Sequence, residues 1–435
     1  LGNNTVVNSS SPVQVGTETD WSSVSAGGSH TVAVKTGGPL WAWGNNDMGQ
    51  LGNNTVVNSS SPVRIGTDNW VSVSAGNAHT VARRTDDSIW GWGNNYLGQL
   101  GDGTFVPRIF TGRIGTDTNW VSVSAGGNHS FGVKTGGSLW GWGANFAGQL
   151  GDGTIGAKVF PGRVGTEIPW VSVATGGNYT VAAMTNGTLW EWGTNNSGQL
   201  GVGSHGRKIL PVRVGTDPWL SVSAGGNFSA GVKTAGTLWT WGRNSDSQLG
   251  IGTYASKNSP VQVGSVSDWA SATAGRHHGV ARKTNGELWA WGAGSNGELG
   301  YGGTDYHDTP VQVGSDSDWV SFSTKMNHSV ALKTNRSLWA WGGNDSGQLG
   351  DNTVVNKSSP VHVGTDTWIS ASVGESHTVA VRADGSLWAW GNNGSGQLGT
   401  GNNDNSLRPV QVGTGTNWAS VSAGNFHSVA RKTNG

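Results

Sequence analysis

The sequence predicts an all-β fold, a β-propeller of four-stranded antiparallel blades with eight to nine repeats of about 50 residues. Three observations predict it: a Trp-x-Trp-Gly motif that occurs eight times, a strand-like Trp segment that occurs nine times, and the confinement of all 25 Trp to these two motifs. The first Trp of the doublets lies at positions 41, 90, 140, 190, 239, 289, 339 and 388, and the single Trp at 21, 70, 120, 170, 219, 269, 319, 368 and 418.

The second repeat shows the four strands that we expect in order. Residues 61–66 form a short β-prone run with Pro62 at its entry, where a missing amide donor is tolerated. Residues 70–75 alternate Val with Ser at the period of two that a strand requires, and a glycine follows. Residues 79–85 form a third strand, and a tight turn leads into residues 88–93. We expect these four strands, in this order, to make one blade.

A long Gly- and Asn-rich loop follows the fourth strand and contains a Gly-Gln-Leu-Gly element at 98–101. Loops of this length are uncommon unless they pack on themselves or bind something. Trp90 and Trp92 share one face of the strand, and Gly91 and Gly93 lie on the other. We therefore predict that the paired indoles fill the wedge between blades, each contributing several kcal/mol through burial (~25 cal/mol per Å2) before entropic costs.

The unbroken period predicts one domain, residues 1–435, built from nine tandem repeats of which the last lacks its Trp-x-Trp strand. A nine-bladed ring that is one strand short is the leading geometry. An eight-bladed ring with an extra partial unit and an open superhelical array are the alternatives. Both ends fall inside a repeat, which indicates a piece of a longer chain.

Composition excludes several classes of protein. Only 12% of residues are charged, and Lys plus Arg equals Asp plus Glu at 26 each, so the net charge does not favour nucleic-acid binding. There is no Cys for a disulfide or thiolate site, and no apolar run long enough to span a membrane. The abundance of Asn, Ser and Thr favours an extracellular or cell-surface location, with a cytoplasmic one as the alternative.

The repeat resembles that of the regulator of chromosome condensation family. The matching residues are Ala-Gly-Asn-Ala-His-Thr-Val-Ala at 75–82 and Ile-Trp-Gly-Trp-Gly-Asn-Asn-Tyr-Leu-Gly-Gln-Leu-Gly at 89–101, and the likeness covers essentially the whole chain. The resemblance implies a β-propeller of four-stranded blades. The founding members have seven repeats, a basic tail and an inserted wedge that engages the small GTPase Ran. Neither the tail nor the wedge is visible here, which disfavours nucleotide exchange.

No residue pattern predicts a catalytic, metal or cofactor site. Seven His share one repeat position, but Tyr179 and Phe228 replace them in two repeats, so the position requires a planar ring rather than a metal ligand. The Gly-x-Gly-x-x-Gly runs at 151–156 and 201–206 lack the following helix of a dinucleotide site and read as turns. Asp102 and Asp152 supply one carboxylate per loop, too few for calcium. The seven His are His30, His79, His129, His278, His328, His377 and His427.

A candidate binding sector lies where the repeats differ. Four consecutive repeats carry Arg at one strand position, and nearby loops add cations and aromatic residues. Arg with aromatic residues is typical of protein-binding hot spots and of contacts with anionic glycans, while a solvated loop face is the alternative. The partner-binding residues so predicted are Arg64, Arg108, Arg113, Lys158, Arg163, Arg207, Lys208, Arg213, Phe105, Phe110, Phe160, Tyr254 and Tyr306.

The function that these observations predict is a non-enzymatic interaction scaffold that binds a protein partner through loops on one sector of the propeller. A carbohydrate-binding surface protein is the alternative, because the paired Trp and the loop aromatics can stack on sugars. A guanine-nucleotide exchange factor for a small GTPase is the second alternative. We expect no cofactor and no nucleic-acid partner.

Overall fold

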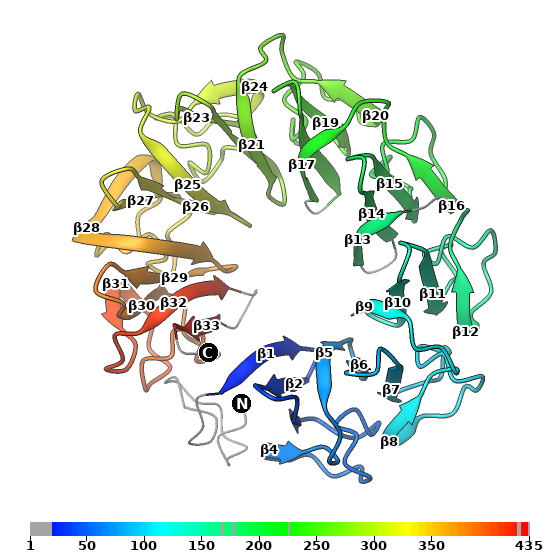
Figure 1. Cartoon of the computed structure of the whole chain (residues 1–435). Coiled ribbons are helices and arrows are strands. Elements are labelled where there is room, and N and C mark those ends of the chain that lie inside the picture. Colours follow the sequence, from blue (N-terminus) through cyan, green and yellow to red (C-terminus); the bar gives the residue numbers. More distant parts are fainter. Residues whose placement is uncertain (1–19, 167–168, 176–178, 225–226, 424–427, 434–435) are drawn as a thin grey trace.

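The computed structural model describes residues 20–166, 169–175, 179–224, 227–423 and 428–433, and these contain 33 strands and no helix. The strands form successive sheets around a common axis, and the first described strand, β1 Trp21–Ala26, lies on the same side of the ring as the last, β33 Ser428–Lys432 (Figure 1). The predicted all-β propeller of four-stranded antiparallel blades is confirmed. Within the described ranges there are eight four-stranded blades, of which the seventh and eighth share one long strand, and a two-stranded unit.

Each blade has four strand positions from the axis outward. The innermost strands are β1 Trp21–Ala26, β5 Trp70–Ala75, β9 Trp120–Ala125, β13 Trp170–Thr175, β17 Trp219–Ala224, β21 Trp269–Ala274, β25 Trp319–Thr324 and β32 Trp418–Ala423. The second strands are β2 His30–Lys35, β6 His79–Arg84, β10 His129–Lys134, β14 Tyr179–Met184, β18 Phe228–Lys233, β22 His278–Lys283, β26 His328–Lys333, β29 His377–Arg382 and β33 Ser428–Lys432.

The third strands carry the Trp doublets: β3 Leu40–Gly44, β7 Ile89–Gly93, β11 Leu139–Gly143, β15 Leu189–Gly193, β19 Leu238–Gly242, β23 Leu288–Gly292, β27 Ser337–Gly342 and β30 Leu387–Gly391. The outermost strands are β4 Ser59–Arg64, β8 Arg108–Arg113, β12 Lys158–Arg163, β16 Lys208–Arg213, β20 Lys257–Gln262, β24 His307–Gln312 and β31 Ser406–Gln411. Strand β28 Lys357–Val373 is outermost in blade seven and then innermost in blade eight.

The strands of the second repeat form where the sequence predicts them, but the blade groups them differently. The outermost strand β8 pairs with β7 of the preceding repeat, with Trp90 opposite Arg113. Likewise, residues 61–66 belong to β4 and pair with the doublet strand at Trp41, not with β5. The expected blade of residues 61–93 is therefore wrong. The long loop after the doublet lets the next segment fold back antiparallel on the free edge of that strand.

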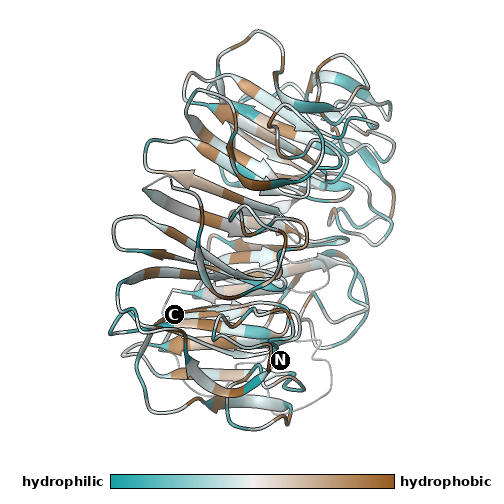
Figure 2. Ribbon diagram, turned by 90° about the vertical axis from the view of Figure 1, so that its right-hand side faces the viewer, coloured by the Kyte–Doolittle hydropathy of each residue, from teal (hydrophilic) through white to brown (hydrophobic). Residues whose placement is uncertain are grey.

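The alternating strand directions place the connections on two faces. One face, here the loop face, carries the short connections from innermost to second strand, such as 76–78, and the long loops such as 94–107. The opposite face, here the turn face, carries the second-to-third hairpins, such as 85–88, and the links between blades, such as 114–119. In the edge-on view, hydrophobic segments lie mostly within the strands and hydrophilic ones mostly in these connections (Figure 2). No helix able to cross a bilayer occurs in the described ranges.

The second Trp of each doublet fills the wedge between blades, as predicted. Trp92 is fully buried and packs with Trp70 against Leu40 and Leu51 of blade one. Its indole Nε1 donates to the carbonyl oxygen of Gln50 at 3.0 Å, so the one polar atom of the side chain is also satisfied. The glycine after Leu51 is required here, since a Cβ on Gly52, whose φ is +75°, would lie 2.7 Å from that Nε1.

The first Trp of each doublet has a different environment on the turn face. Trp140 is half-buried, and the ammonium of Lys134 lies 3.9 Å from its ring centroid and 4.6 Å from that of Trp120. Asp117 pairs with the same ammonium at 2.6 Å. Met184 replaces this cation in blade four. The cation covers the exposed part of the indoles, so these Trp are packing residues rather than open platforms for sugars.

The long loops fold on a buried Asn. The Asn95 side-chain amide donates to the carbonyl of Thr104 at 3.0 Å and to the carboxylate of Asp102 at 3.1 Å, and its oxygen accepts from the amide of Leu100 at 2.9 Å. Asn95 is fully buried. The loop therefore packs on itself, which is one of the two explanations that its length allows.

The repeated His is buried between blades. His79 Nε2 lies 3.0 Å from the hydroxyl of Ser130 in the next blade, and His30 makes the same contact with Thr80. Burial lowers the pKa of His79 to about 3 and that of His129 to about 4. These imidazoles are neutral packing groups at neutral pH. His427 lies outside the described residues.

Replacing His129 with Phe, the residue type that Phe228 provides in blade five, should reduce acid sensitivity. The pKa of His129 is lowered in the fold, so its contribution to stability is present above the ordinary value of 6.5 and is lost as the pH falls toward about 4. By linkage the loss at pH 5 is about 2 kcal/mol. Urea unfolding at pH 8 and pH 5 measures it. The exposed His205→Asn variant is the control, and an unchanged pH dependence in His129→Phe contradicts the assignment.

Candidate functional site

The predicted binding residues fall on three different parts of the propeller. Arg108, Lys158 and Lys208 begin the outermost strands on the loop face, and Arg113 and Arg213 end two of these strands on the turn face. Strand β8 bulges between Arg108 and Arg113, which lie opposite Gly93 and Trp90 of β7, three residues or about 10 Å apart along that strand. The side chain of Arg108 pairs with Asp102 of the long loop, whereas that of Arg113 bonds to Thr116 of the link between blades. The structure therefore does not gather the predicted set into one patch.

Two of the loop-face cations are held by carboxylates inside their own loops. Arg108 pairs with Asp102 at 2.7 Å, and the Asp102 side chain is only 3% exposed. Lys158 pairs with Asp152 at 3.1 Å. The Asp102 carboxylate also accepts from the amide and the hydroxyl of Thr104 at 3.0 and 2.8 Å. Both members of this pair are thus occupied with folding the loop.

The turn face carries a row of four exposed Arg on consecutive blades. Each is the last residue of an outermost strand. The guanidinium of Arg113 donates to the carbonyl of Thr116 at 2.8 Å, and Arg213 makes the same contact with Thr216. No carboxylate pairs with them among the described residues, so this row is positively charged. Its members are Arg64, Arg113, Arg163 and Arg213.

The outer rim of blades two to four carries three exposed apolar side chains at equivalent positions. Phe110, Phe160 and Leu210, here called the apolar rim, are 52%, 63% and 51% exposed. Each is the third residue of its outermost strand. The same position in the other blades is polar: Ser61, Ser259, Thr309, Ser359 and Arg408.

Neighbouring blades fix the apolar rim in place. The amide of Gly103 in the blade-two loop donates to the carbonyl of Val159 at 2.7 Å, and the ring of Phe160 lies over that glycine. A Cβ on Gly103 would be 2.6 Å from the ring. Leu210 lies in the same way beside Gly153 of blade three. The three side chains are therefore presented at a fixed spacing along the rim.

Exposed aromatic residues of the loops extend this sector on the loop face. Tyr96 and Phe146 are each 61% exposed, and Arg207 donates to the carbonyl of Phe146 at 2.8 Å. Phe105 is 52% exposed, but its position is apolar in most blades and does not distinguish this sector. Tyr254 and Tyr306 are exposed on the loops of blades five and six, outside it.

Leu210, Tyr96 and Phe146 are additions that the sequence prediction missed. The signal for these three residues lies in the sequence, at positions of the repeat other than the Arg position. Tyr96 and Phe146 stand where the other loops have small or polar residues, such as Asp47 and Asn196.

One hollow lies beside this sector. A hollow of about 260 Å3 lies between blades two and three beside Phe146. Its titratable lining residue is His129, which burial keeps neutral. Among the described residues, no group of three or more His, Asp or Glu side chains is placed to hold a metal ion.

Models of one protein family match most of this chain. The family model described as RCC1-like domain matches residues 1–267, and the regulator of chromosome condensation (RCC1) repeat matches residues 285–332, 337–381 and 384–431. A second RCC1 repeat model matches 269–298, 319–348 and 368–397. A search of curated protein sequences found no match.

Solved structures share the fold. Prp20p from Saccharomyces cerevisiae is 20% identical with a TM-score of 0.55, covering 79% of this chain and 90% of its own. Human WBSCR16 is 19% identical with a TM-score of 0.54, covering 90% of this chain and 98% of its own. At these identities the likeness concerns the fold alone.

Two single substitutions separate the structural cations from the free ones. Arg108→Met leaves the buried Asp102 carboxylate without its counter-ion and should lower the free energy of unfolding by about 1–3 kcal/mol. Arg113→Met removes an exposed side chain without an ion pair and should change it by less than about 0.5 kcal/mol. Urea unfolding of both variants measures the difference. Equal effects would contradict the assignment of Arg108 to loop folding.

Proposed function

The chain belongs to the family of RCC1-like domains, and from this premise we propose that it is a non-enzymatic propeller that binds a protein partner at the apolar rim of blades two to four. The observation that carries the proposal is the replacement of Ser or Thr by Phe110, Phe160 and Leu210 on three adjacent blades, with half or more of each side chain exposed. Exposed apolar side chains at one position of three adjacent blades cost solubility and are typical of an interaction surface.

The charges beside the rim define the partner that it fits. Arg108 and Lys158 are neutralised by their loop carboxylates. Arg207 and Lys208 have no carboxylate partner among the described residues, and Arg207 lies against Phe146. A protein surface with apolar side chains flanked by carboxylates complements this arrangement.

Other members of the fold support a protein partner. The Prp20p structure is described with its binding properties to Gsp1p and histones, and a second yeast RCC1 (Prp20) structure shows it bound by Kap60. Those interactions belong to those proteins. They support the class of ligand and leave the docking surface to be argued from the residues of this chain.

We also propose that all nine repeats form one propeller and that it acts outside the cell or at its surface, in line with the abundance of Asn, Ser and Thr. Fractionation of the source cells tests the location. Recovery only in the cytosolic fraction would contradict it.

The triple variant Phe110→Ser, Phe160→Ser and Leu210→Ser tests the rim with residue types that other blades carry. A protein captured from the source by the unmodified chain is identified, purified and titrated against each variant. The triple variant should keep its melting temperature and weaken the Kd by about 100-fold, because hot-spot side chains each contribute more than about 1 kcal/mol.

The matched control removes exposed apolar side chains elsewhere, by Val56→Ser, Val354→Ser and Val355→Ser. It should bind as the unmodified chain does. An unchanged Kd in the rim variant contradicts the proposal.

Reversal of the turn-face row by Arg113→Glu, Arg163→Glu and Arg213→Glu tests the alternative site. Loss of binding in this charge-reversal variant would assign the partner to the turn face. Capture of a glycan instead of a protein would favour the carbohydrate-binding alternative.

A further inference from the structure

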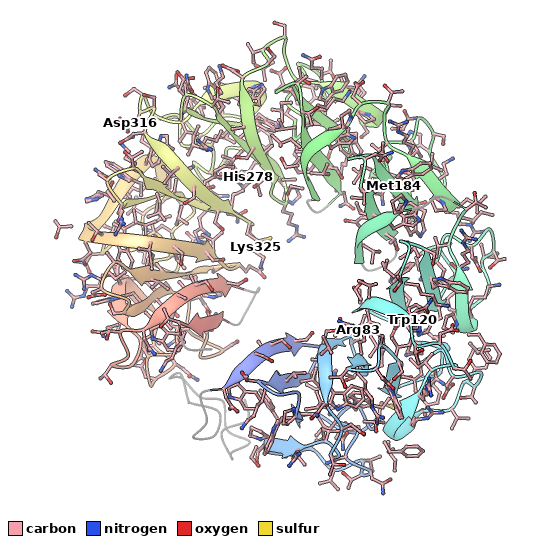
Figure 3. All side chains as sticks on the ribbon, viewed as in Figure 1. Arg83, Trp120, Met184, His278, Asp316 and Lys325 are labelled. Carbon is pink, nitrogen blue, oxygen red and sulfur yellow. The ribbon has the colours of Figure 1, made fainter. Side chains whose placement is uncertain are left out.

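The connections from innermost to second strand lie near the axis on the loop face, and three adjacent blades differ there from the rest. In the described chain, blades one to three have small residues at the two positions after the innermost strand: Gly27 and Gly28, Gly76 and Asn77, Gly126 and Gly127. Blades six to eight carry long side chains there: Arg276, Lys325, Met326 and Glu375. In Figure 3, Lys325 lies on the inner side of the ring, toward its middle.

Arg276 and Lys325 start from connections that contact each other directly. The backbone amide of Arg276 donates to the carbonyl of Lys325 at 2.9 Å. The guanidinium of Arg276 lies 3.5 Å from the sulfur of Met326. Two cationic side chains on neighbouring blades therefore start from connections that are bonded to each other.

Neither cation has an ion-pair partner in the described part of the chain. This sets them apart from the cations at the ends of the second strands in blades seven and eight, since Lys333 pairs with Asp316 at 2.8 Å and Arg382 pairs with Asp366. The ammonium of Lys325 donates to the carbonyl of Ala423 at 3.2 Å. Burial lowers the pKa of Lys325, and the charge of Glu375 opposes that shift. A partly buried cation without a counter-ion is stabilised by any anion that reaches it.

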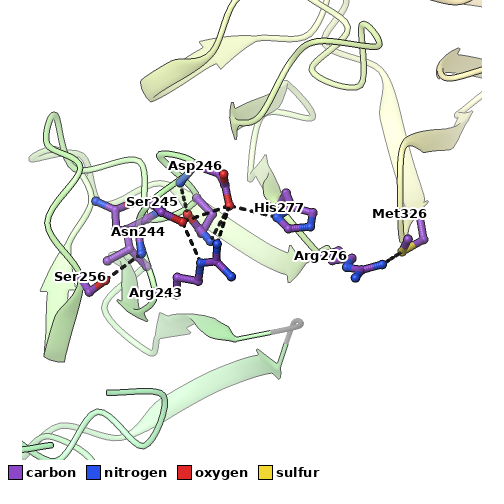
Figure 4. Close-up of polar contacts among 10 residues, drawn as sticks. Arg243, Asn244, Ser245, Asp246, Ser256, Arg276, His277 and Met326 are labelled. Atoms are coloured by element: carbon purple, nitrogen blue, oxygen red, sulfur yellow. Dashed lines mark hydrogen bonds and ion pairs between the residues drawn. The ribbon is translucent and has the colours of Figure 1, made fainter. Parts of the chain in front are cut away.

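The neighbouring carboxylate of Asp246 is already engaged. Asp246 lies 3.0 Å from Nδ1 of His277 and 3.9 Å from the guanidinium of Arg243. Figure 4 shows His277 directed toward Asp246, whereas Arg276 extends the other way, toward Met326. The charge of Arg276 is therefore left for a ligand.

We propose that Arg276 and Lys325 form a carboxylate-binding site near the axis of the loop face, which takes an Asp or Glu side chain of an acidic protein segment. Cations form short, strong hydrogen bonds with carboxylates. Two cations neutralise few phosphates, so a nucleic acid, whose binding depends on many cations, fits the site less well than a short acidic segment does. The site is separate from the apolar rim and does not rest on it.

A fluorescein-labelled hexaglutamate peptide tests the site by fluorescence anisotropy at low salt, with hexaglutamine as the uncharged reference. Only hexaglutamate should bind. Arg276→Gln and Lys325→Gln should each weaken its Kd about tenfold, and the double variant about 100-fold, as expected for charge-assisted hydrogen bonds. The shorter Gln side chain of Lys325→Gln loses the bond to the carbonyl of Ala423 as well as the charge. The melting temperature of this variant is therefore measured alongside, and a loss of binding at an unchanged melting temperature reports the charge.

Arg163→Gln, which removes an exposed charge on the turn face, is the matched control and should bind as the unmodified chain does. The rim triple variant should also bind hexaglutamate normally, which separates failure of this proposal from failure of the rim site. No binding of hexaglutamate, unchanged binding by the double variant, or dependence on the pair for a heparin oligosaccharide or single-stranded DNA alone would overturn the proposal.

Discussion

The propeller depends on one contact that recurs at each junction: the second indole of a Trp doublet inserted between its own blade and the preceding one. Trp92 illustrates it, with its ring buried against Leu40 and Leu51 and its Nε1 bonded to the carbonyl of Gln50. Each of blades two to eight supplies an indole to the blade before it, and each of blades one to seven receives one from the blade after it. The near-constant period follows, because an insertion in either partner would displace the indole from its site.

The contact of the second indole lies in the interior of the ring, so the outermost strand takes no part in it. The long loop of the preceding blade holds that strand by a backbone hydrogen bond, such as the one from the amide of Gly103 to the carbonyl of Val159. Such a bond does not depend on the type of side chain. The third residue of the strand can then be Ser259 in one blade and Phe160 in another without change in the fold. Residues that hold the ring and residues that distinguish its sectors are thereby separate sets.

Periodicity and strand propensity were sufficient to predict the strands at 70–75, 79–84 and 89–93 and the burial of the second indole of each doublet, whereas the first indole is only half-buried. They were insufficient to predict blade membership, since a repeat pattern has no information on which of two neighbouring sheets a segment joins. The predicted site residues are divided between the two faces for a related reason. Arg108 and Arg113 are close in sequence, but they stand at the two ends of β8 and bond to Asp102 on the loop face and Thr116 on the turn face.

The net charge of zero conceals two classes of cation. Lys134 and its equivalents are stacked on indoles and paired with carboxylates, so their fields are cancelled within a few ångströms. Arg276 and Lys325 lack such partners in the described chain and act on whatever approaches the axis. A net charge of zero is therefore compatible with local recognition of an anion. For a repeat protein, the informative quantity is the charge left unpaired in each blade, because the paired charge belongs to the fold.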